Sequence, residues 1–421
     1  MRFTGEIIVE DMTKEERVRA EKVESVLPAL KASAIDVDRS GQFNEGHVKT
    51  FSEVGLLGLV VPKKYGGLGG NLRDLCAATF AMGTVCPSTA LAYFFHCSSS
   101  SRGLLALEAL EEGLFDKAEA KSVKPFAEKV LHTMGRDGKW LANFASESVK
   151  SEKSAITIST KARKVDGGYS LSGVKAFGCA TGVADRYLVT AGLAGIDDAS
   201  GLCTFFIDRD ASGVSERQKW DSLGMRGTAT HGLILENVFV ADEDAMAVPG
   251  AFVKSMQMSR GSFVGNQLAG ICVYAGAAYG AYKSVMELLT TRKFADTGRP
   301  LGTSPFHQQL IGEMLTDLET SLLWARRQLL LESSDPPLKS KIEVVKQWRL
   351  CKGVISESGF RVAMNALKSA GTSGTGNTQP FARALRDMGM GLVQAFPAER
   401  GKLMAAQMEM EGAEQAQFGV G

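Results

Sequence analysis

The sequence predicts an α+β protein that is mainly helical, with an N-terminal helical domain, a middle barrel- or sandwich-like β domain and a C-terminal four-helix bundle. Apolar residues recur at helical spacing in the first third of the chain. They alternate in the next hundred residues and then return to helical spacing. We therefore expect domains at residues 1–140, 141–245 and 246–421.

The N-terminal domain is expected to be a series of helices separated by Pro and Gly. The helix at residues 48–59 stops before Pro62 and a Gly-rich turn, and another stops before Pro87. The expected helical segments are residues 15–30, 48–59, 74–85, 88–113 and 116–131.

The middle domain is predicted from strand-like alternation. Residues 156–160 read Ile-Thr-Ile-Ser-Thr, which is typical of a half-buried strand, and Asp166-Gly-Gly168 is a hairpin turn signal. Further strands are expected at residues 187–191, 202–207 and 233–240. After them, the pattern predicts long helices at residues 250–292, 305–333, 338–370 and 380–392.

Bulk composition excludes several classes of function. The 421 residues carry a net charge of +1, which leaves no electrostatic footprint for nucleic acid. The seven cysteines and five histidines lie at no metal-binding spacing, so no metal site is predicted and a reducing cytoplasm is expected. The longest apolar run, residues 268–282, is shorter than the roughly 20 residues of a membrane span, and acids occupy the place of a signal peptide.

Four motifs carry a family resemblance. They are Val61-Pro-Lys-Lys-Tyr-Gly-Gly-Leu-Gly69, the stretch from Leu171 to Asp185 with Phe177-Gly-Cys179, Gly224-Met-Arg-Gly227 and Arg383-Ala-Leu-Arg-Asp387. Over nearly the whole chain, the sequence resembles the acyl-CoA dehydrogenase superfamily. That resemblance implies FAD, with its isoalloxazine ring between the β domain and the C-terminal bundle.

The resemblance implies two flavin-binding segments in the β domain. In the first, Ser146 would offer its hydroxyl to the polar edge of the flavin. In the second, Phe177 would pack on the ring, followed by Gly178, and Cys179 would stand near the reactive nitrogen, where a small side chain is needed. Cys179 is also consistent with a small buried residue of no redox role.

Further flavin contacts are implied in the bundle. Arg292 and Gln308 match positions that contact the dinucleotide of a neighbouring subunit, and a guanidinium suits pyrophosphate. Gly371 and Gly374 resemble glycines that admit the backbone close to the adenine. A homodimer or homotetramer is therefore expected.

Two residues are candidates for binding the substrate. Arg260 matches an arginine that lies near the carrier end of an acyl thioester, and a solvated helix arginine is the equal alternative. His96 lies on a helix that in this family lines the acyl pocket. It is either a substrate contact or a packed core histidine, and we favour the second.

The catalytic base of the dehydrogenases is not at its usual position. The glutamate that removes the proton next to the thioester is replaced by Ala395, and the position used by a minority of members is Ser259. Glu399 is the candidate for a displaced base, although a first-turn helix acid is the more ordinary interpretation. Glu147 is a second carboxylate nearby, with a structural match.

Three functions are therefore weighed. The leading expectation is a dehydrogenase of an acyl-CoA or a carrier-bound acyl thioester, passing electrons to a flavoprotein. The alternative is a monooxygenase acting on a small aromatic or amine, using oxygen and flavin (FMN in place of FAD) supplied reduced by a partner reductase. Phe177, Cys179 and the missing glutamate favour this alternative. The third is a member that keeps the fold without catalysis.

Overall fold

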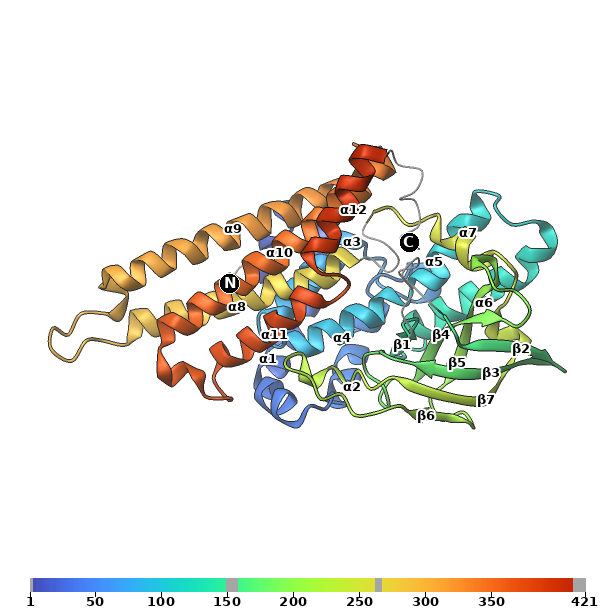
Figure 1. Cartoon of the computed structure of the whole chain (residues 1–421), viewed down its shortest axis with the longest axis horizontal. Helices are drawn as coiled ribbons and strands as arrows, with labels where there is room; N and C mark the ends of the chain where they lie inside the picture. The colour runs from blue at the N-terminus through green and yellow to red at the C-terminus, as the bar shows by residue number, and fades with distance from the viewer. Residues whose placement is uncertain (1–2, 149–157, 262–266, 412–421) are drawn as a thin grey trace.

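The computed structural model describes residues 3–148, 158–261 and 267–411, and it confirms the predicted fold class. Figure 1 shows the long helices of the C-terminal region at one end and the curled sheet at the other, with N-terminal helices α3 and α4 between them. Among the helices of the described residues, none combines the length and apolar character that a membrane span requires.

The N-terminal region is built from six α-helices with well-defined ends. Helix α1 starts at a capping box in which Thr13 and Glu16 each bond the other's backbone, and it ends at Gly41 with a φ of 65°. The bounds are α1 (Lys14–Ser40), α2 (Gly46–Glu53), α3 (Leu72–Gly83), α4 (Pro87–Ser98), α5 (Ser101–Glu111) and α6 (Lys117–Gly135).

The middle region is a single curled sheet. Its strands are β1 (Leu141–Phe144), β2 (Lys161–Val165), β3 (Gly168–Lys175), β4 (Arg186–Leu193), β5 (Leu202–Asp208), β6 (Val214–Glu216), β7 (Leu233–Ala241) and β8 (Ala245–Met246). They are ordered β6-β7-β3-β2-β4-β5-β8, and β1 pairs with β4 in parallel. The hairpin of β2 and β3 turns at the predicted Asp166-Gly167.

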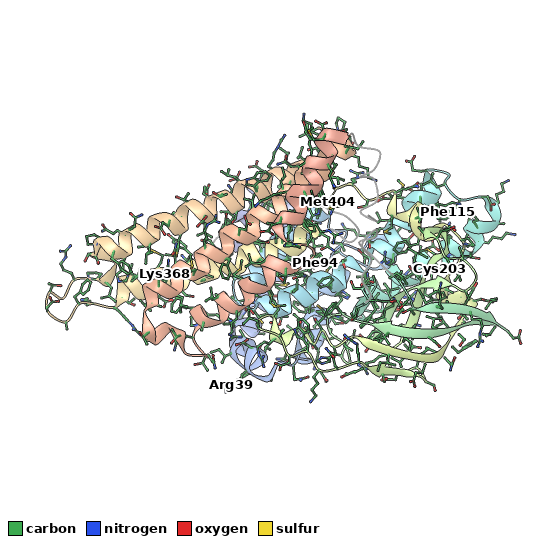
Figure 2. All side chains as sticks on the ribbon, viewed as in Figure 1. Arg39, Phe94, Phe115, Cys203, Lys368 and Met404 are labelled. Carbon is green, nitrogen blue, oxygen red and sulfur yellow. The ribbon has the colours of Figure 1, made fainter. Side chains whose placement is uncertain are left out.

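The C-terminal region follows the sheet. Its helices are α7 (Ala251–Met256), α8 (Gln267–Thr291), α9 (Pro305–Ser333), α10 (Lys341–Ala370), α11 (Pro380–Val393) and α12 (Ala398–Glu411). Figure 2 shows Phe94 of α4, which is fully buried, near the middle of the molecule.

Helices α3 and α8 approach each other at backbone contact distance. A Cβ on Gly276 would lie 2.1 Å from the carbonyl oxygen of Phe80, and one on Gly280 would lie 2.4 Å from that of Thr84. Glycine is therefore required here because no side chain fits between the helices. This contact joins the N-terminal region to the bundle without intervening side chains.

Three predicted helices are divided in the structure. The one predicted at residues 48–59 ends as an α-helix at Glu53, and a 3-10 turn follows at Leu56–Gly58. The segment predicted at residues 88–113 breaks at Ser99-Ser100, where both hydroxyls bond back to carbonyls of the preceding turn. Within its described residues, the segment predicted at residues 250–292 contains the helices α7 and α8.

One predicted strand is not found where it was expected. Ile156 and Thr157 lie outside the described residues, and the described remainder of residues 156–160 forms no strand. The alternation there continues into β2, which begins at Lys161.

Candidate active site

The Arg383–Asp387 motif of α11 contacts both the N-terminal region and a loop of the β domain. Arg386 forms an ion pair of 2.5 Å with Asp38 of α1, and Arg383 donates to the carbonyl of Val85 beyond α3. Asp387 accepts a 2.6 Å hydrogen bond from the backbone N–H of Met225. The motif therefore holds the N-terminal region and a β-domain loop against α11.

Gly224 and Asp387 make this junction tight. A Cβ on Gly224 would lie 2.1 Å from the carbonyl oxygen of Arg386, so only glycine lets the loop lie on the helix. Burial raises the pKa of Asp387 to about 6, against the opposing charge of Arg383 and the N–H of Met225.

The predicted flavin segment at residues 176–180 lies across β1. The N–H of Ala176 donates to the carbonyl of Ser146 at 2.9 Å, which brings the two predicted β-domain segments side by side. A Cβ on Gly178 would lie 2.1 Å from the ring of Phe144, so this position must be glycine. The side chain of Ser146 itself is exposed.

Cys179 ends a short chain of hydroxyl contacts. Its Sγ lies 3.2 Å from Oγ1 of Thr230, which lies 2.8 Å from Oγ1 of Thr228. Burial raises the pKa of Cys179 to about 12, against the two threonine hydroxyls, so the thiol is neutral at physiological pH. Cys179 is therefore a small buried residue whose neutral thiol lacks the thiolate that redox chemistry needs.

Phe177 presents its ring at the surface of the β domain. It is 49% exposed and packs edge to face on Trp220, with ring centroids 6.1 Å apart. Leu223 and Val393, which are 63% and 62% exposed, lie on the nearby loop and on α11, and Leu223 contacts Gly389 of α11. Exposed apolar side chains at the junction of the sheet and α11 fit the face of a flat aromatic ligand such as the flavin.

Glu147 forms a buried ion pair in the β domain. Its carboxylate lies 2.6 Å from Nζ of Lys175, and both side chains are at most 1% exposed. It also accepts hydrogen bonds from the backbone and hydroxyls of Ser159 and Thr160. Burial alone would raise the pKa of Glu147, but the charge of Lys175 and these donors lower it to about 2. Glu147 is therefore a permanently ionised structural acid.

The corner between α11 and α12 contains Ala395, at the position where the family resemblance predicts the base. Ala395 is exposed, with a φ of 62°, and Glu399 is an exposed residue in the first turn of α12. Beneath the corner, Nζ of Lys352 donates to the carbonyls of Gly391 at 2.8 Å and Phe396 at 2.5 Å. The corner is thus held by a buried ammonium.

Sequence reasoning missed Lys352. It lies on the same face of α10 as Trp348 and Ile355, both fully buried or nearly so, and a lysine among apolar residues at helical spacing is the signal that could have found it. Burial lowers the pKa of Lys352 to about 8, while Glu357 and Glu399 oppose this shift.

The flavin-binding residues predicted in the bundle lie far from Phe177 and Cys179. Arg292 directly follows α8 and Gln308 lies in the first turn of α9, and both are exposed. Gly371, with a φ of 68°, and the buried Gly374 lie between α10 and α11. Figure 1 shows both loops at the end of the bundle opposite to the sheet. One chain therefore does not bring Arg292 next to Phe177.

The two substrate candidates differ in exposure. Arg260 is exposed, and its charge acts on Glu108 of α5. His96 is fully buried, with Nδ1 accepting from the N–H of Leu141 at 2.9 Å and Nε2 donating to the carbonyl of Leu57 at 2.8 Å. No ring nitrogen of His96 is left for a substrate, so it is the packed core histidine of the two interpretations.

We predict that His96 contributes to acid sensitivity. Burial lowers the pKa of His96 to about 4, so its stabilising effect is present above pH 6.5 and lost as the pH falls toward 4. The free energy of unfolding should lose up to about 3 kcal/mol from this group. Urea unfolding at pH 7.5 and 5.0 checks this, and His96→Gln should show a smaller pH dependence. Equal pH dependence of the two proteins would contradict the prediction.

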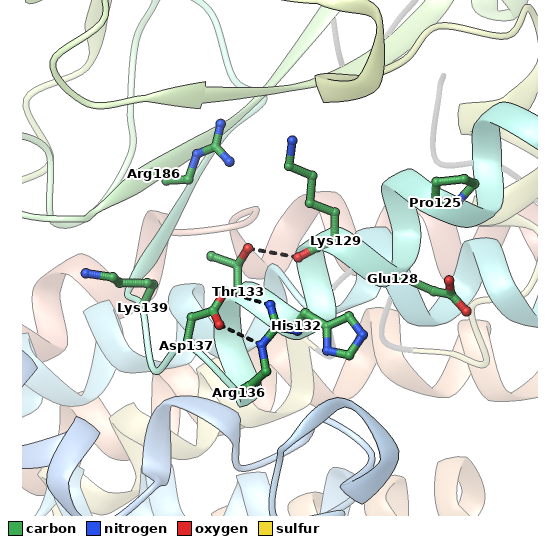
Figure 3. A pocket seen from close by; sticks show the side chains of 9 residues that line it. All are labelled: Pro125, Glu128, Lys129, His132, Thr133, Arg136, Asp137, Lys139 and Arg186. Atoms are coloured by element: carbon green, nitrogen blue, oxygen red, sulfur yellow. Dashed lines mark hydrogen bonds and ion pairs between the residues drawn. The ribbon is translucent and has the colours of Figure 1, made fainter.

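A hollow of about 640 Å³ lies elsewhere, between α6 and β4. Figure 3 shows Lys129, Arg136, Lys139 and Arg186 around it. The four cations pair with carboxylates, as Lys129 does with Asp244 at 2.7 Å. None of the predicted site residues lines this hollow.

Comparison with known proteins agrees with the domain order. Residues 13–108, 142–238 and 269–396 match models of the N-terminal, middle and C-terminal domains of acyl-CoA dehydrogenase. The chain is 26% identical to mitochondrial isovaleryl-CoA dehydrogenase of Solanum tuberosum, over 91% of this chain and 87% of that protein. It is 25% identical to cyclohex-1-ene-1-carbonyl-CoA dehydrogenase of Syntrophus aciditrophicus, over 90% and 85%.

Solved structures share the fold at lower identity. Butyryl-CoA dehydrogenase of Megasphaera elsdenii has a TM-score of 0.77 at 19% identity, covering 95% of this chain and 99% of that one. Dibenzothiophene monooxygenase of Paenibacillus sp. A11-2 has a TM-score of 0.76 at 18% identity, covering 94% and 97%. KijD3, solved with FMN and an amino-keto sugar nucleotide, has a TM-score of 0.79 at 22% identity, covering 99% of each chain.

Proposed function

This chain belongs to the acyl-CoA dehydrogenase family and is a flavin oxidoreductase, and we propose that it oxygenates a small organic substrate with reduced flavin and oxygen. The observation that carries the proposal is the corner at Ala395, where the dehydrogenases need a carboxylate. Two buried acids lie in the family motifs, and both already bind structural partners. Glu147 pairs with Lys175, and Asp387 accepts a hydrogen bond from the backbone of Met225.

The residues present fit a flavin. Phe177 offers an exposed ring, and Cys179 offers a small neutral side chain. The segment at residues 176–180 offers backbone groups beside Ser146. Bound there, FAD or FMN delivered reduced by a partner reductase would supply two electrons. One oxygen atom enters the substrate and the other leaves as water. The chain's part is to hold the substrate beside Phe177 and to exclude water there.

The placement of Arg292 and Gln308 supports a dimer under this proposal. They lie at the bundle end opposite to Phe177, so a dinucleotide that reaches both must be shared with a second copy. A dimer or a dimer of dimers follows, and sedimentation with and without FAD tests it.

The second candidate is the acyl-thioester dehydrogenase, with electrons passing to a flavoprotein. It is favoured by the relatives at 25–26% identity, which are named as acyl-CoA dehydrogenases. Glu399 would be its base, since it directly follows the corner in α12.

Two measurements separate the candidates. We expect oxygen consumption by the full chain with reduced FMN or FAD, and no anaerobic bleaching of the bound flavin by isovaleryl-CoA or butyryl-CoA. Glu399→Gln should leave oxygen consumption unchanged. Bleaching by an acyl-CoA that Glu399→Gln abolishes would establish the dehydrogenase instead.

Phe177 is predicted to dominate flavin affinity. Phe177→Ala removes an aromatic ring whose burial on the flavin is worth roughly 1.5–3 kcal/mol, so the Kd for flavin should rise about 10- to 100-fold. Phe239→Ala is the matched control, because Phe239 is a 56% exposed phenylalanine on β7. Flavin fluorescence titration measures both, and equal affinities of the two variants would contradict the placement of the ring.

A further inference from the structure

Trp220 packs against the ring on which the flavin proposal depends. The ring centroids of Trp220 and Phe177 are 6.1 Å apart, and the ring planes stand at 83° to each other. Phe177 follows β3 in a segment without helix or strand, and its side chain is 49% exposed. A half-exposed side chain on irregular backbone can change its rotamer unless a neighbour holds it. Trp220 is in position to hold it.

Trp220 is itself fixed by two hydrogen bonds. Its indole Nε1–H donates to the carbonyl of Met225 at 3.1 Å, and its backbone N–H donates to Nδ1 of His231 at 2.8 Å. His231 is 4% exposed, and burial lowers its pKa, so the imidazole is neutral and Nδ1 can accept. The backbone and the ring of Trp220 are therefore both held, and the indole can serve as a fixed support.

Met225 connects this support to α11. Its carbonyl accepts from Nε1 of Trp220 and, at 2.9 Å, from the hydroxyl of Thr228. Its own N–H donates to the carboxylate of Asp387 at 2.6 Å. Met225 has a φ of 50°, in the left-handed region that a long side chain rarely adopts, so the surrounding contacts must impose this conformation. Trp220 is thus tied to α11 through a single residue with a constrained backbone.

The loop of residues 220–231 also holds the segment that follows Phe177. The carbonyl of Thr228 accepts a hydrogen bond from the N–H of Ala180 at 2.8 Å. The next carbonyl of the loop accepts one from the N–H of Thr181 at 3.0 Å. The same loop therefore contacts the predicted flavin segment at the ring of Phe177 and again further along its backbone.

We propose that Trp220 is a positioning residue for the cofactor, which fixes the orientation in which Phe177 presents its ring to the flavin. The inference rests on flavin binding at Phe177 under the proposed function, and it holds for either redox chemistry. Trp220 acts through Phe177 and needs no contact with the flavin. An edge-to-face pair of aromatic rings changes an equilibrium constant about 2- to 10-fold, so an effect of this order is expected when the pair is broken.

A double-mutant cycle on the full chain tests whether Trp220 acts through Phe177. Flavin fluorescence titration measures the Kd for FAD and for FMN in the wild type, Trp220→Ala, Phe177→Ala and the double variant. We expect Trp220→Ala to raise the Kd about 2- to 10-fold in the wild-type background and to have no effect in the Phe177→Ala background. An equal factor in both backgrounds, or no effect in the wild-type background, would overturn the proposal.

Further variants separate positioning from folding. Trp220→Phe keeps an aromatic ring against Phe177 and should restore part of the affinity that Trp220→Ala loses. Trp220→Leu keeps an apolar side chain without the ring, and it replaces the Ala variant in the cycle if that protein does not fold. Trp324→Phe changes the partly buried tryptophan of α9 and is the matched control, which should leave the Kd unchanged.

The spectrum of the bound flavin gives a readout that a purely structural role would not move. At saturating flavin, the visible circular dichroism of Trp220→Ala should differ from that of the wild type, because the ring beside the flavin is reoriented. An unchanged spectrum would show that Phe177 keeps its orientation without Trp220 and would overturn the proposal. Wild-type protein that binds no flavin would remove the proposed function and this inference together. Bleaching of the flavin by an acyl-CoA would remove the oxygenation and leave the role of Trp220 standing.

Discussion

Glu147→Ala is expected to lower the free energy of unfolding by about 3–5 kcal/mol, the largest effect of any single change considered. The substitution leaves Lys175 as a fully buried ammonium with no counterion, since its Nζ pairs with Glu147 at 2.6 Å and both side chains are buried. Urea unfolding of wild type and variant at pH 7.5 measures the loss.

The matched control for this prediction is an exposed pair in the same domain. Lys161 and Asp197 lie 3.0 Å apart, with the Asp197 side chain 91% exposed, so Asp197→Ala should cost no more than about 1 kcal/mol. The double variant Glu147→Leu with Lys175→Met should recover much of the loss, because both charges are removed together. A Glu147→Ala protein as stable as Asp197→Ala would show that the pair does not stabilise the domain.

The second large effect is expected for Arg386→Ala, at about 2–4 kcal/mol. This change leaves the carboxylate of Asp38, which is 10% exposed, without its guanidinium partner. It also removes a 3.3 Å hydrogen bond to the carbonyl of Leu223. Because these contacts join α1, the β-domain loop and α11, we also expect the unfolding transition to broaden as the regions separate.

A pair within the bundle is the control for Arg386. Arg361 also binds its partner, Asp317, with both Nε and Nη2, but it is 48% exposed and links only α9 and α10. Arg361→Ala leaves an Asp317 side chain that is 14% exposed, so it should cost about 1–2 kcal/mol, and it should leave the transition sharp because no second region is released. If both variants lose the same stability with equal cooperativity, the junction at Arg386 has no special role.

The order of the fold could be predicted because it follows from local periodicity. The helix predicted at residues 305–333 is α9, and the strands predicted at residues 202–207 and 233–240 lie within β5 and β7. Helix breaks were harder to predict, since Ser99 and Ser100 stop a helix only through hydroxyl bonds that the apolar pattern does not reveal.

The candidate site was predicted in its segments but not in its charges. The resemblance identified the chain around Phe177 and the corner at Ala395, because these are continuous motifs. The pairing of Glu147 with Lys175 depends on how β3 lies against a distant loop, which no single segment encodes. Lys352 is one of several charges in α10, and only its burial marks it as important.

The glycine contact between α3 and α8 limits how the two helical regions can move relative to each other. Gly276 lies against the backbone of Phe80, and Gly280 lies against that of Thr84. The two helices therefore cannot slide or separate without losing these contacts. We therefore expect the two helical regions to move together. A motion of the sheet relative to them would strain the hydrogen bond between Met225 and Asp387 first.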